Sequence, residues 1–145
     1  MTNQEIADIF DLLSKLMDIH GENSFKSKTY STAAYRLEKL PGSLQEMSPE
    51  QINSISGIGD AVTRKIQEIL NTGKLAVLEE YLDKTPPGVV EMLSIKGIGP
   101  KKIAVLWKEL GAESIGELEY ACNETRLITL KGFGAKTQES ILKSI

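Results

Sequence analysis

Residues 94–102 read SIKGIGPKK, and the same arrangement occurs at residues 54–59 (SISGIG) and 129–137 (TLKGFGAKT). In each copy an apolar residue stands two positions before a glycine, and a second apolar residue and a second glycine follow. Glycine permits positive φ and carries no Cβ, so the pattern predicts a tight turn that a ligand can approach closely. We expect the middle residue of each turn to point inward; these residues are Ile58, Ile98 and Phe133.

Helix signals surround the three turns. Thr2 and Ser48 each open a capping-box pattern, and apolar residues then recur at helical spacing. A further helix is expected over residues 27–40, and Asp60 is expected to cap the helix that follows the first turn. No segment alternates between apolar and polar residues as a strand would, so the sequence predicts an all-α fold.

The chain is long enough for one compact domain or two small ones. It has 145 residues, and 41% of them are hydrophobic, which is enough for a real core. The best boundary signal is Thr85-Pro86-Pro87-Gly88, because two prolines and a glycine interrupt helical structure. We therefore expect a first helical domain over 1–85, with the first turn inside 49–72, and a second over 86–145, with turns at 97–99 and 132–134.

Several classes of site are excluded by composition. Cys122 and His20 are the only residues of their types, so a disulfide, a Cys-rich metal site and a histidine triad cannot form within the chain. We expect Cys122 to be a small buried side chain. The start, MTNQEIADIF, has acidic flanks and no long apolar run, so no signal peptide or membrane span is expected. The chain is predicted to be a cytoplasmic monomer.

Positive charge gathers at the turns although the net charge is −3. Residues 94–108 contain four lysines and no acid. A helix that begins directly after a glycine turn presents unpaired amides and the positive end of its dipole, which together form an anion site. Phosphate contacts of this kind carry no sequence information, so sequence-independent DNA binding is expected. The candidate contacts at the turns are Gly57, Gly59, Gly97, Gly99, Lys101, Lys102, Gly132, Gly134 and Lys136.

A purely structural role is the alternative for each turn. A single Gly-x-Gly between helices is often only a tight connection, and Phe133 could serve simply as a core residue. Three copies, each followed by a helix that carries lysine or arginine, favour the phosphate-binding interpretation.

The pattern h-x-G-h-G is the helix-hairpin-helix motif, and longer stretches resemble family X DNA polymerases, bacterial members in particular. SISGIGDAVTRKIQEILNTGKLAVLEEY is similar to the hairpin of the family's lyase domain, and LSIKGIGPKKIAVLWKELGAESIGELE is similar to its second hairpin. FKSKTYSTAAYRLEKLPG resembles the family's second helix, and LKGFGAKTQESIL resembles the third hairpin of bacterial members. The resemblance covers nearly the whole chain in the family's order.

This resemblance implies two subdomains: one like the N-terminal domain of polymerase beta, and a fingers-like helix-hairpin-helix subdomain after it. The first hairpin would hold the 5′-phosphate side of a gap and the second hairpin the primer side, as in base excision repair. Gapped, nicked or abasic DNA would be the partner, and the chain would be associated with the bacterial nucleoid. Further DNA contacts are implied at Phe25, Lys26, Lys28, Tyr30 and Arg64. Core packing is an alternative role for Phe25.

Two kinds of ion are implied by the resemblance. A monovalent cation, K⁺ or Na⁺, would bind backbone carbonyls at the first two hairpins, and carbonyl oxygens at a sharp turn suit such an ion. Mg²⁺ would belong to a polymerase palm with its carboxylate triad, which this chain lacks, so we expect no primer extension by the chain itself. The carbonyls belong to Asn53, Ile55 and Ile58 and to Leu93, Ile95 and Ile98.

Lys65 matches the family's Schiff-base lysine, which attacks the C1′ aldehyde of an abasic sugar. This match implies abasic-site or deoxyribose-phosphate lyase activity, whereas the alternative is an ordinary solvated lysine on an amphipathic helix. Three departures from the polymerase beta pattern weigh against the activity: Arg64 replaces an acid, Ala61 a basic residue, and Phe25 a pocket histidine. Whether the chain is an enzyme is left open.

Two other functions remain compatible with the sequence. One is a stand-alone helix-hairpin-helix protein that binds DNA structures without catalysis. The other is a helical protein–protein adaptor, which would need an exposed apolar patch. Trp107 is the candidate for such a patch, and a core role for Trp107 is the alternative.

Overall fold

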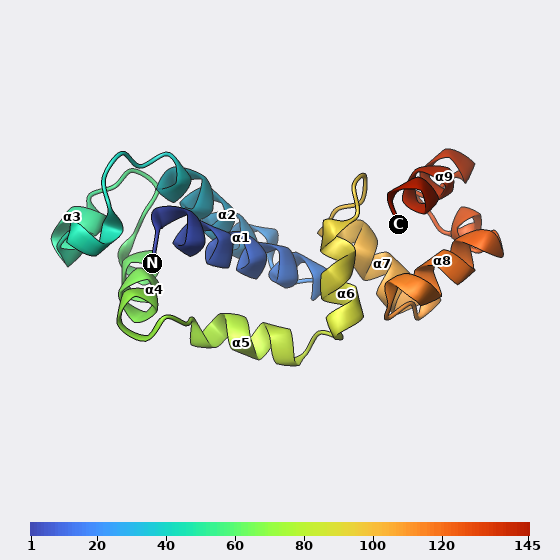
Figure 1. Ribbon diagram of the computed structural model, residues 1–145, viewed down its shortest axis with the longest axis horizontal. Coiled ribbons are helices and arrows are strands. Elements are labelled where there is room, and N and C mark those ends of the chain that lie inside the picture. Colours follow the sequence, from blue (N-terminus) through green and yellow to red (C-terminus); the bar gives the residue numbers. More distant parts are fainter. The chain divides into compact units, whose positions relative to one another are not determined.

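The computed structural model describes residues 1–145 and contains helices and turns but no strand (Figure 1). The all-α prediction is therefore confirmed. The chain divides into two compact units, which are described separately. Unit 1 comprises residues 1–18 and 22–81, and unit 2 comprises residues 19–21 and 82–145.

Unit 1 is built on two long helices, α1 (Asn3–Ile19) and α2 (Ser24–Glu38). The ring of Phe10 on α1 stacks on the ring of Tyr30 on α2, with centroids 6.0 Å apart, and this pair lies in the core. A short 3₁₀ helix η1 and three further helices complete the fold: η1 (Leu44–Glu46), α3 (Pro49–Asn53), α4 (Asp60–Thr72) and α5 (Ala76–Asp83).

The predicted capping boxes are present. At the start of α1, the Thr2 hydroxyl accepts a hydrogen bond from the Glu5 amide at 3.1 Å, and the Glu5 carboxylate accepts one from the Thr2 amide at 3.0 Å. Ser48 and Gln51 form the same reciprocal pair at the start of α3. Each box satisfies amides that a helix start otherwise leaves unpaired.

Helix α2 begins three residues before the predicted start at residue 27. Its cap is Asn23, whose side chain accepts a hydrogen bond from the Phe25 amide at 2.8 Å. The earlier start places Phe25 and Lys26 in the first turn of a helix rather than in a loop.

Unit 2 packs short helices around an apolar core. Gly88 on α6 lies so close to the chain before α8 that a Cβ there would be 2.1 Å from the Glu113 carbonyl oxygen. No side chain larger than hydrogen fits at this crossing. The elements are α6 (Pro87–Glu91), η2 (Met92–Ser94), α7 (Pro100–Leu110), α8 (Ile115–Asn123), η3 (Leu127–Thr129) and α9 (Ala135–Ser144).

The change of unit falls between Tyr81 and Leu82 at the end of α5. The proline pair that suggested a boundary after Thr85 follows shortly and opens α6, where Pro87 occupies the first turn. None of the helices combines the length and the apolar character needed to span a bilayer.

Candidate nucleic-acid interface

The three glycine turns have the same backbone geometry. At the first glycine φ is positive, +86° at Gly57, +92° at Gly97 and +88° at Gly132. At the second glycine the backbone is extended, with φ of −102° at Gly59, −101° at Gly99 and −122° at Gly134. We call the turns hairpins 1, 2 and 3. Only the first glycine of each hairpin needs positive φ, the region that glycine tolerates best.

The second glycine of each hairpin is the N-cap of a helix, and no side chain caps that helix. The first intrahelical bond in α4 runs from the Thr63 amide to the Gly59 carbonyl at 2.9 Å, and α7 and α9 have equivalent bonds of 3.0 Å. The amides before these donors have no acceptor within their own helix. Asp60 was predicted to cap α4, and this prediction is wrong, because Asp60 is the first helical residue.

The middle residues point inward as predicted. Ile58, Ile98 and Phe133 are 4%, 7% and 6% exposed, whereas the flanking glycines are exposed. Each hairpin is thus attached to its core by one apolar side chain, and its glycines face solvent. The core alternative for Phe133 is correct for its side chain, and it coexists with an exposed turn.

The second glycines have open space where a Cβ would lie. A Cβ built on Gly59, Gly99 or Gly134 meets no atom of the protein within 4 Å. Their negative φ is also open to other residues. Neither packing nor backbone conformation therefore requires glycine at these positions. Glycine is, however, a better N-cap than alanine, and the open space would also admit the close approach of an external backbone.

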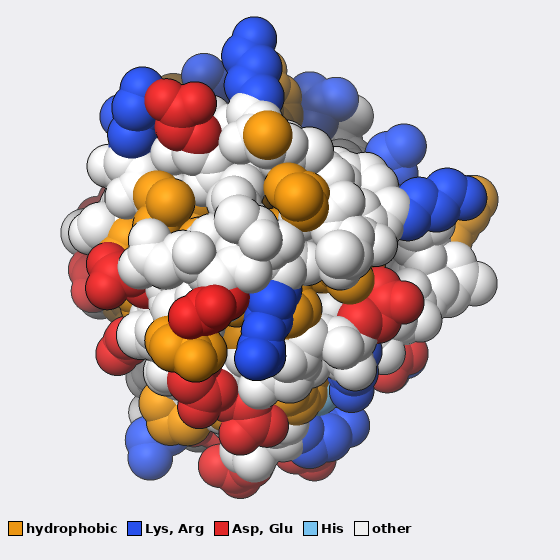
Figure 2. Space-filling model, turned by 90° about the vertical axis from the view of Figure 1, so that its right-hand side faces the viewer, with side chains coloured by type: hydrophobic (Ala, Val, Ile, Leu, Met, Phe, Trp, Pro, Cys, Tyr) orange, Lys and Arg blue, Asp and Glu red, His pale blue; other side chains and the backbone are white.

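Charge differs between the three hairpins. Asp60 lies in the first turn of α4, whereas α7 begins with Pro100, Lys101 and Lys102, and α9 carries Lys136. On the face drawn in Figure 2, lysine and arginine side chains lie along the upper edge and also at the centre and the lower edge, and apolar side chains are scattered among polar ones. The lysines that open α7 and α9 thus add an attraction for phosphate that the first turn of α4, which carries Asp60, lacks.

A depression of about 370 Å³ adjoins hairpin 1. Its lining residues are Phe25, Lys28, Thr29, Thr32 and Gly57, and we call it the hairpin-1 groove. Phe25 is 85% exposed, so the core alternative for this residue is wrong. The structure thus brings Phe25 and Lys28, two residues predicted from the sequence, to the first hairpin glycine.

Arg36 is a basic residue beside this hairpin that the sequence analysis missed. A Cβ on Gly57 would be 3.3 Å from Arg36 Cγ and 3.5 Å from Arg36 Nε. A helical stripe could have revealed it, because Phe25, Thr29, Thr32 and Arg36 follow one another at spacings of three or four. Through Thr32 and Arg36 the stripe contacts Gly57 of hairpin 1, so a guanidinium lies beside this glycine.

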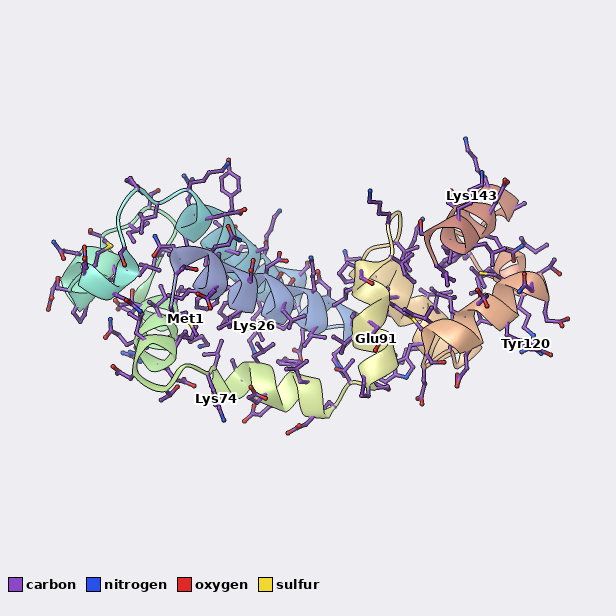
Figure 3. The ribbon with its side chains drawn as sticks, in the orientation of Figure 1. Met1, Lys26, Lys74, Glu91, Tyr120 and Lys143 are labelled. Carbon is purple, nitrogen blue, oxygen red and sulfur yellow. The ribbon has the colours of Figure 1, made fainter.

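Tyr30 is mainly a core residue, which corrects its assignment as a direct DNA contact. It is 8% exposed, because its ring stacks on Phe10. The Lys65 Nζ lies 5.6 Å from the Tyr30 ring centroid, and Lys65 is half-buried. Lys26, labelled in Figure 3, is exposed and one helical turn from Tyr30, and it is not among the residues that line the hairpin-1 groove.

Arg64 and Cys122, the one cysteine of the chain, have different surroundings. Arg64 lines a separate depression together with Glu50 and Asp60. Cys122 is buried, and burial, followed by the nearby Glu119 charge, raises the pKa of its thiol.

Trp107 does not stand out as an exposed apolar patch. Its side chain is half-buried, and its indole N–H donates a hydrogen bond to the Glu113 carboxylate at 3.2 Å. The Lys108 Nζ lies 4.0 Å from the ring centroid. Trp107, the candidate for the exposed apolar patch that an adaptor would need, therefore makes these contacts within unit 2.

Comparison with known proteins identifies the family. Residues 1–75 match the model described as a helix-hairpin-helix domain, and residues 89–145 match that of a SAM-like helix-hairpin-helix tandem. The chain belongs to the helix-hairpin-helix family. The three hairpins lie within these two matched regions.

The curated relatives are DNA polymerases. The chain is 36% identical over all of its 145 residues to a DNA polymerase/3′-5′ exonuclease PolX of Bacillus subtilis, of which it covers 25%. It is 30% identical over 140 residues, 96% of the chain, to a DNA polymerase lambda of Arabidopsis thaliana, of which it covers 25%. A rat DNA polymerase lambda is 28% identical over 117 residues, 80% of the chain and 19% of the relative.

The chain thus spans a quarter or less of these relatives. Its predicted resemblance to the N-terminal part of a family X DNA polymerase is confirmed. The matched families and the relatives support DNA binding.

Proposed function

We propose that the chain is the DNA-gripping module of a family X repair polymerase and that it prefers gapped or nicked DNA to intact duplex. The observation that carries this proposal is the open space around the second hairpin glycines, next to helix starts without side-chain caps. A sugar–phosphate backbone can enter that space and accept hydrogen bonds from the free amides. Bases need not be read, so binding is independent of sequence.

Each unit contributes different contacts to the DNA. In unit 1, hairpin 1, Lys28 and Arg36 bind one strand at the 5′-phosphate side of the gap, and Phe25 stacks on an unpaired base. In unit 2, hairpin 2 binds the primer side through Lys101 and Lys102. Hairpin 3 adds contacts through the amides that follow Gly134 and through Lys136.

The predicted monovalent-cation sites are part of this proposal. The Ile55 carbonyl accepts a hydrogen bond from the Ile58 amide at 3.0 Å, which leaves one of its two lone pairs for an ion. The donor set of Asn53, Ile55 and Ile58, and that of Leu93, Ile95 and Ile98, consists of carbonyl oxygens, and such oxygens fit K⁺ or Na⁺. When bound, the ion supplies positive charge beside the phosphate.

A salt titration tests DNA binding. Affinity for a one-nucleotide gapped duplex with a 5′-phosphate should fall steeply with salt, because each phosphate contact contributes about 0.9 to the slope of log K against log salt. The gapped duplex should bind more tightly than the intact duplex of the same sequence. Equal affinities would contradict the gap preference, and no binding at low salt would favour the adaptor alternative.

A lyase reaction at Lys65 is a second candidate function, and the half-buried position of Lys65 favours it over the solvated-lysine alternative. Lys65 is half-buried with its Nζ over an aromatic ring, so the side chain is held in one region rather than free in solvent. In the reaction, the neutral Nζ attacks the C1′ aldehyde, and the carbinolamine loses water to form an imine. Removal of a C2′ proton then expels the 3′-phosphate by β-elimination.

Borohydride trapping tests the lyase. Reduction of the imine should leave the chain covalently attached to incised abasic DNA, and Lys65→Ala should abolish the adduct. Lys74→Ala, which changes an exposed lysine of the same unit, is the matched control and should still be trapped. An adduct that persists in Lys65→Ala, or no adduct with the unaltered chain, would refute this second function and leave DNA binding unaffected.

A further inference from the structure

Hairpins 2 and 3 meet through one pair of side chains in unit 2. The Nζ of Lys102, in the first turn of α7, lies 5.6 Å from the ring centroid of Phe133 at the centre of hairpin 3. Phe133 is 6% exposed and therefore held firmly in place, and Lys102 is half-buried. A cation above an aromatic face at this distance is attracted by the ring quadrupole.

Neither the neighbouring Lys101 nor the other two hairpins have such a contact between a lysine and an aromatic ring. Lys101 is exposed on the same helix turn, and no aromatic ring holds it. Hairpins 1 and 2 have Ile58 and Ile98 where hairpin 3 has Phe133. Isoleucine can fill the core position but has no π face. Phe133 can therefore attract a lysine ammonium group, which an aliphatic residue in this position cannot do.

A second, weaker contact joins the far end of α9, the helix that follows hairpin 3, to hairpin 2. The Ser144 hydroxyl at the end of α9 donates to the Lys96 carbonyl in hairpin 2 at 3.4 Å, near the limit for a hydrogen bond. In Figure 3, Lys143 of the same helix end extends outward from α9. Helix α9 thus begins at hairpin 3 and ends beside hairpin 2.

We infer that Phe133 is a positioning residue for Lys102 and that hairpins 2 and 3 therefore act as one phosphate-binding surface. This inference rests on the proposed DNA binding. A free lysine loses rotamer freedom when it binds a phosphate, and this loss weakens binding. Phe133 restricts Lys102 before DNA arrives, so less freedom is lost on binding. Lys101 has no such restriction and is ordered only by the DNA.

A double-mutant cycle with a matched control tests the inference. The variants are Phe133→Ile, which copies the other two hairpins, Lys102→Gln and Lys101→Gln. Phe133→Ile should weaken binding to duplex DNA about two- to fivefold, the range of an exposed to partly buried cation–π contact. In the Phe133→Ile background, Lys102→Gln should cost about two- to fivefold less affinity than in the unaltered chain. The cost of Lys101→Gln should be the same in both backgrounds.

Conservative variants separate positioning from folding. Phe133→Tyr keeps the ring face and should keep the affinity and the salt slope, whereas Phe133→Ile should lower the slope toward that of Lys102→Gln. A purely structural effect would lower the melting temperature and leave the slope unchanged. Phe133→Leu takes the place of Phe133→Ile in the cycle if the isoleucine variant does not fold.

Two results would overturn the inference. One is an equal effect of Lys102→Gln in both backgrounds, and the other is unchanged or tighter binding by the folded Phe133→Ile variant. Either result with normal binding by the unaltered chain refutes only the positioning role. Absence of salt-dependent binding by the unaltered chain would instead refute the proposed function, and this inference with it.

Discussion

Arg36 lies against Gly57: a Cβ on this hairpin glycine would be 3.3 Å from Arg36 Cγ. The contact joins α2 to hairpin 1 and places the guanidinium group of Arg36 beside the first glycine of the hairpin. An arginine in this position can bind a phosphate with two parallel hydrogen bonds, which a lysine cannot do.

Arg36→Met should therefore weaken binding to gapped DNA and reduce the salt slope by about 0.9, the contribution of one phosphate contact. Affinity measured at several salt concentrations checks both effects. Lys39→Met, at the end of the same helix and above the Tyr35 ring, is the control and should change neither quantity. A salt slope that stays the same in Arg36→Met would show that Arg36 contacts no phosphate.

Phe25→Ala should reduce affinity for gapped DNA more than affinity for intact duplex. The phenyl ring is 85% exposed at the hairpin-1 groove, and only a gap offers an unpaired base that can stack on it. Stacking on an aromatic side chain contributes about 1–3 kcal/mol per base. Competition binding with the two DNAs measures the difference. Tyr35→Ala removes another exposed aromatic of α2 and should leave the preference intact.

Gly88→Ala should destabilise unit 2 by more than about 2 kcal/mol. The new Cβ would be 2.1 Å from the Glu113 carbonyl oxygen, a backbone atom, so two segments must separate. Gly116→Ala in α8 is the matched control, because its nearest neighbour would be 3.9 Å away, and alanine favours the helix. Chemical denaturation compares the two variants. If the Gly88→Ala chain were as stable as the Gly116→Ala chain, α6 would not pack this closely against the chain before α8.

Alkaline pH should destabilise unit 1 through Tyr81. Burial, then its hydrogen bond to Glu22 at 2.9 Å, raises the pKa of Tyr81 to about 12. A folded pKa above the unfolded value near 10 means that the stabilisation is complete below pH 10 and is lost as the pH rises toward 12. The free energy of unfolding should fall over this window, and less so in Tyr81→Phe. Parallel pH profiles for the two chains would contradict this assignment.

Local signals in the sequence were sufficient for the helices and the hairpins. The glycine pattern predicted the turns, and the caps at Thr2 and Ser48 predicted helix starts, because these features depend on residues a few positions apart. The start of α2 was missed because Asn23 provides the cap, and the sequence analysis took the helix to begin only at Ser27.

Features that depend on packing between distant segments were harder to predict. Tyr30 shares one helical face with Ala33, Ala34 and Leu37, and this spacing favours the core position that its stacking on Phe10 confirms; the DNA contact was implied only by the family resemblance. The approach of Arg36 to Gly57 and of Lys102 to Phe133 joins residues far apart in the sequence. No local pattern encodes such distances, although the helical stripe on α2 was a usable hint.

The most direct test of the central claim is the DNA affinity of a chain in which Gly59, Gly99 and Gly134 are all alanine. These positions have negative φ and open space, so circular dichroism should show the same fold, although alanine at three N-caps should lower the melting temperature somewhat. The methyl groups should keep the sugar–phosphate backbone away from the helix amides, and binding to gapped DNA should be largely lost. Undiminished affinity in a folded triple variant would contradict the claim that these amides hold the DNA.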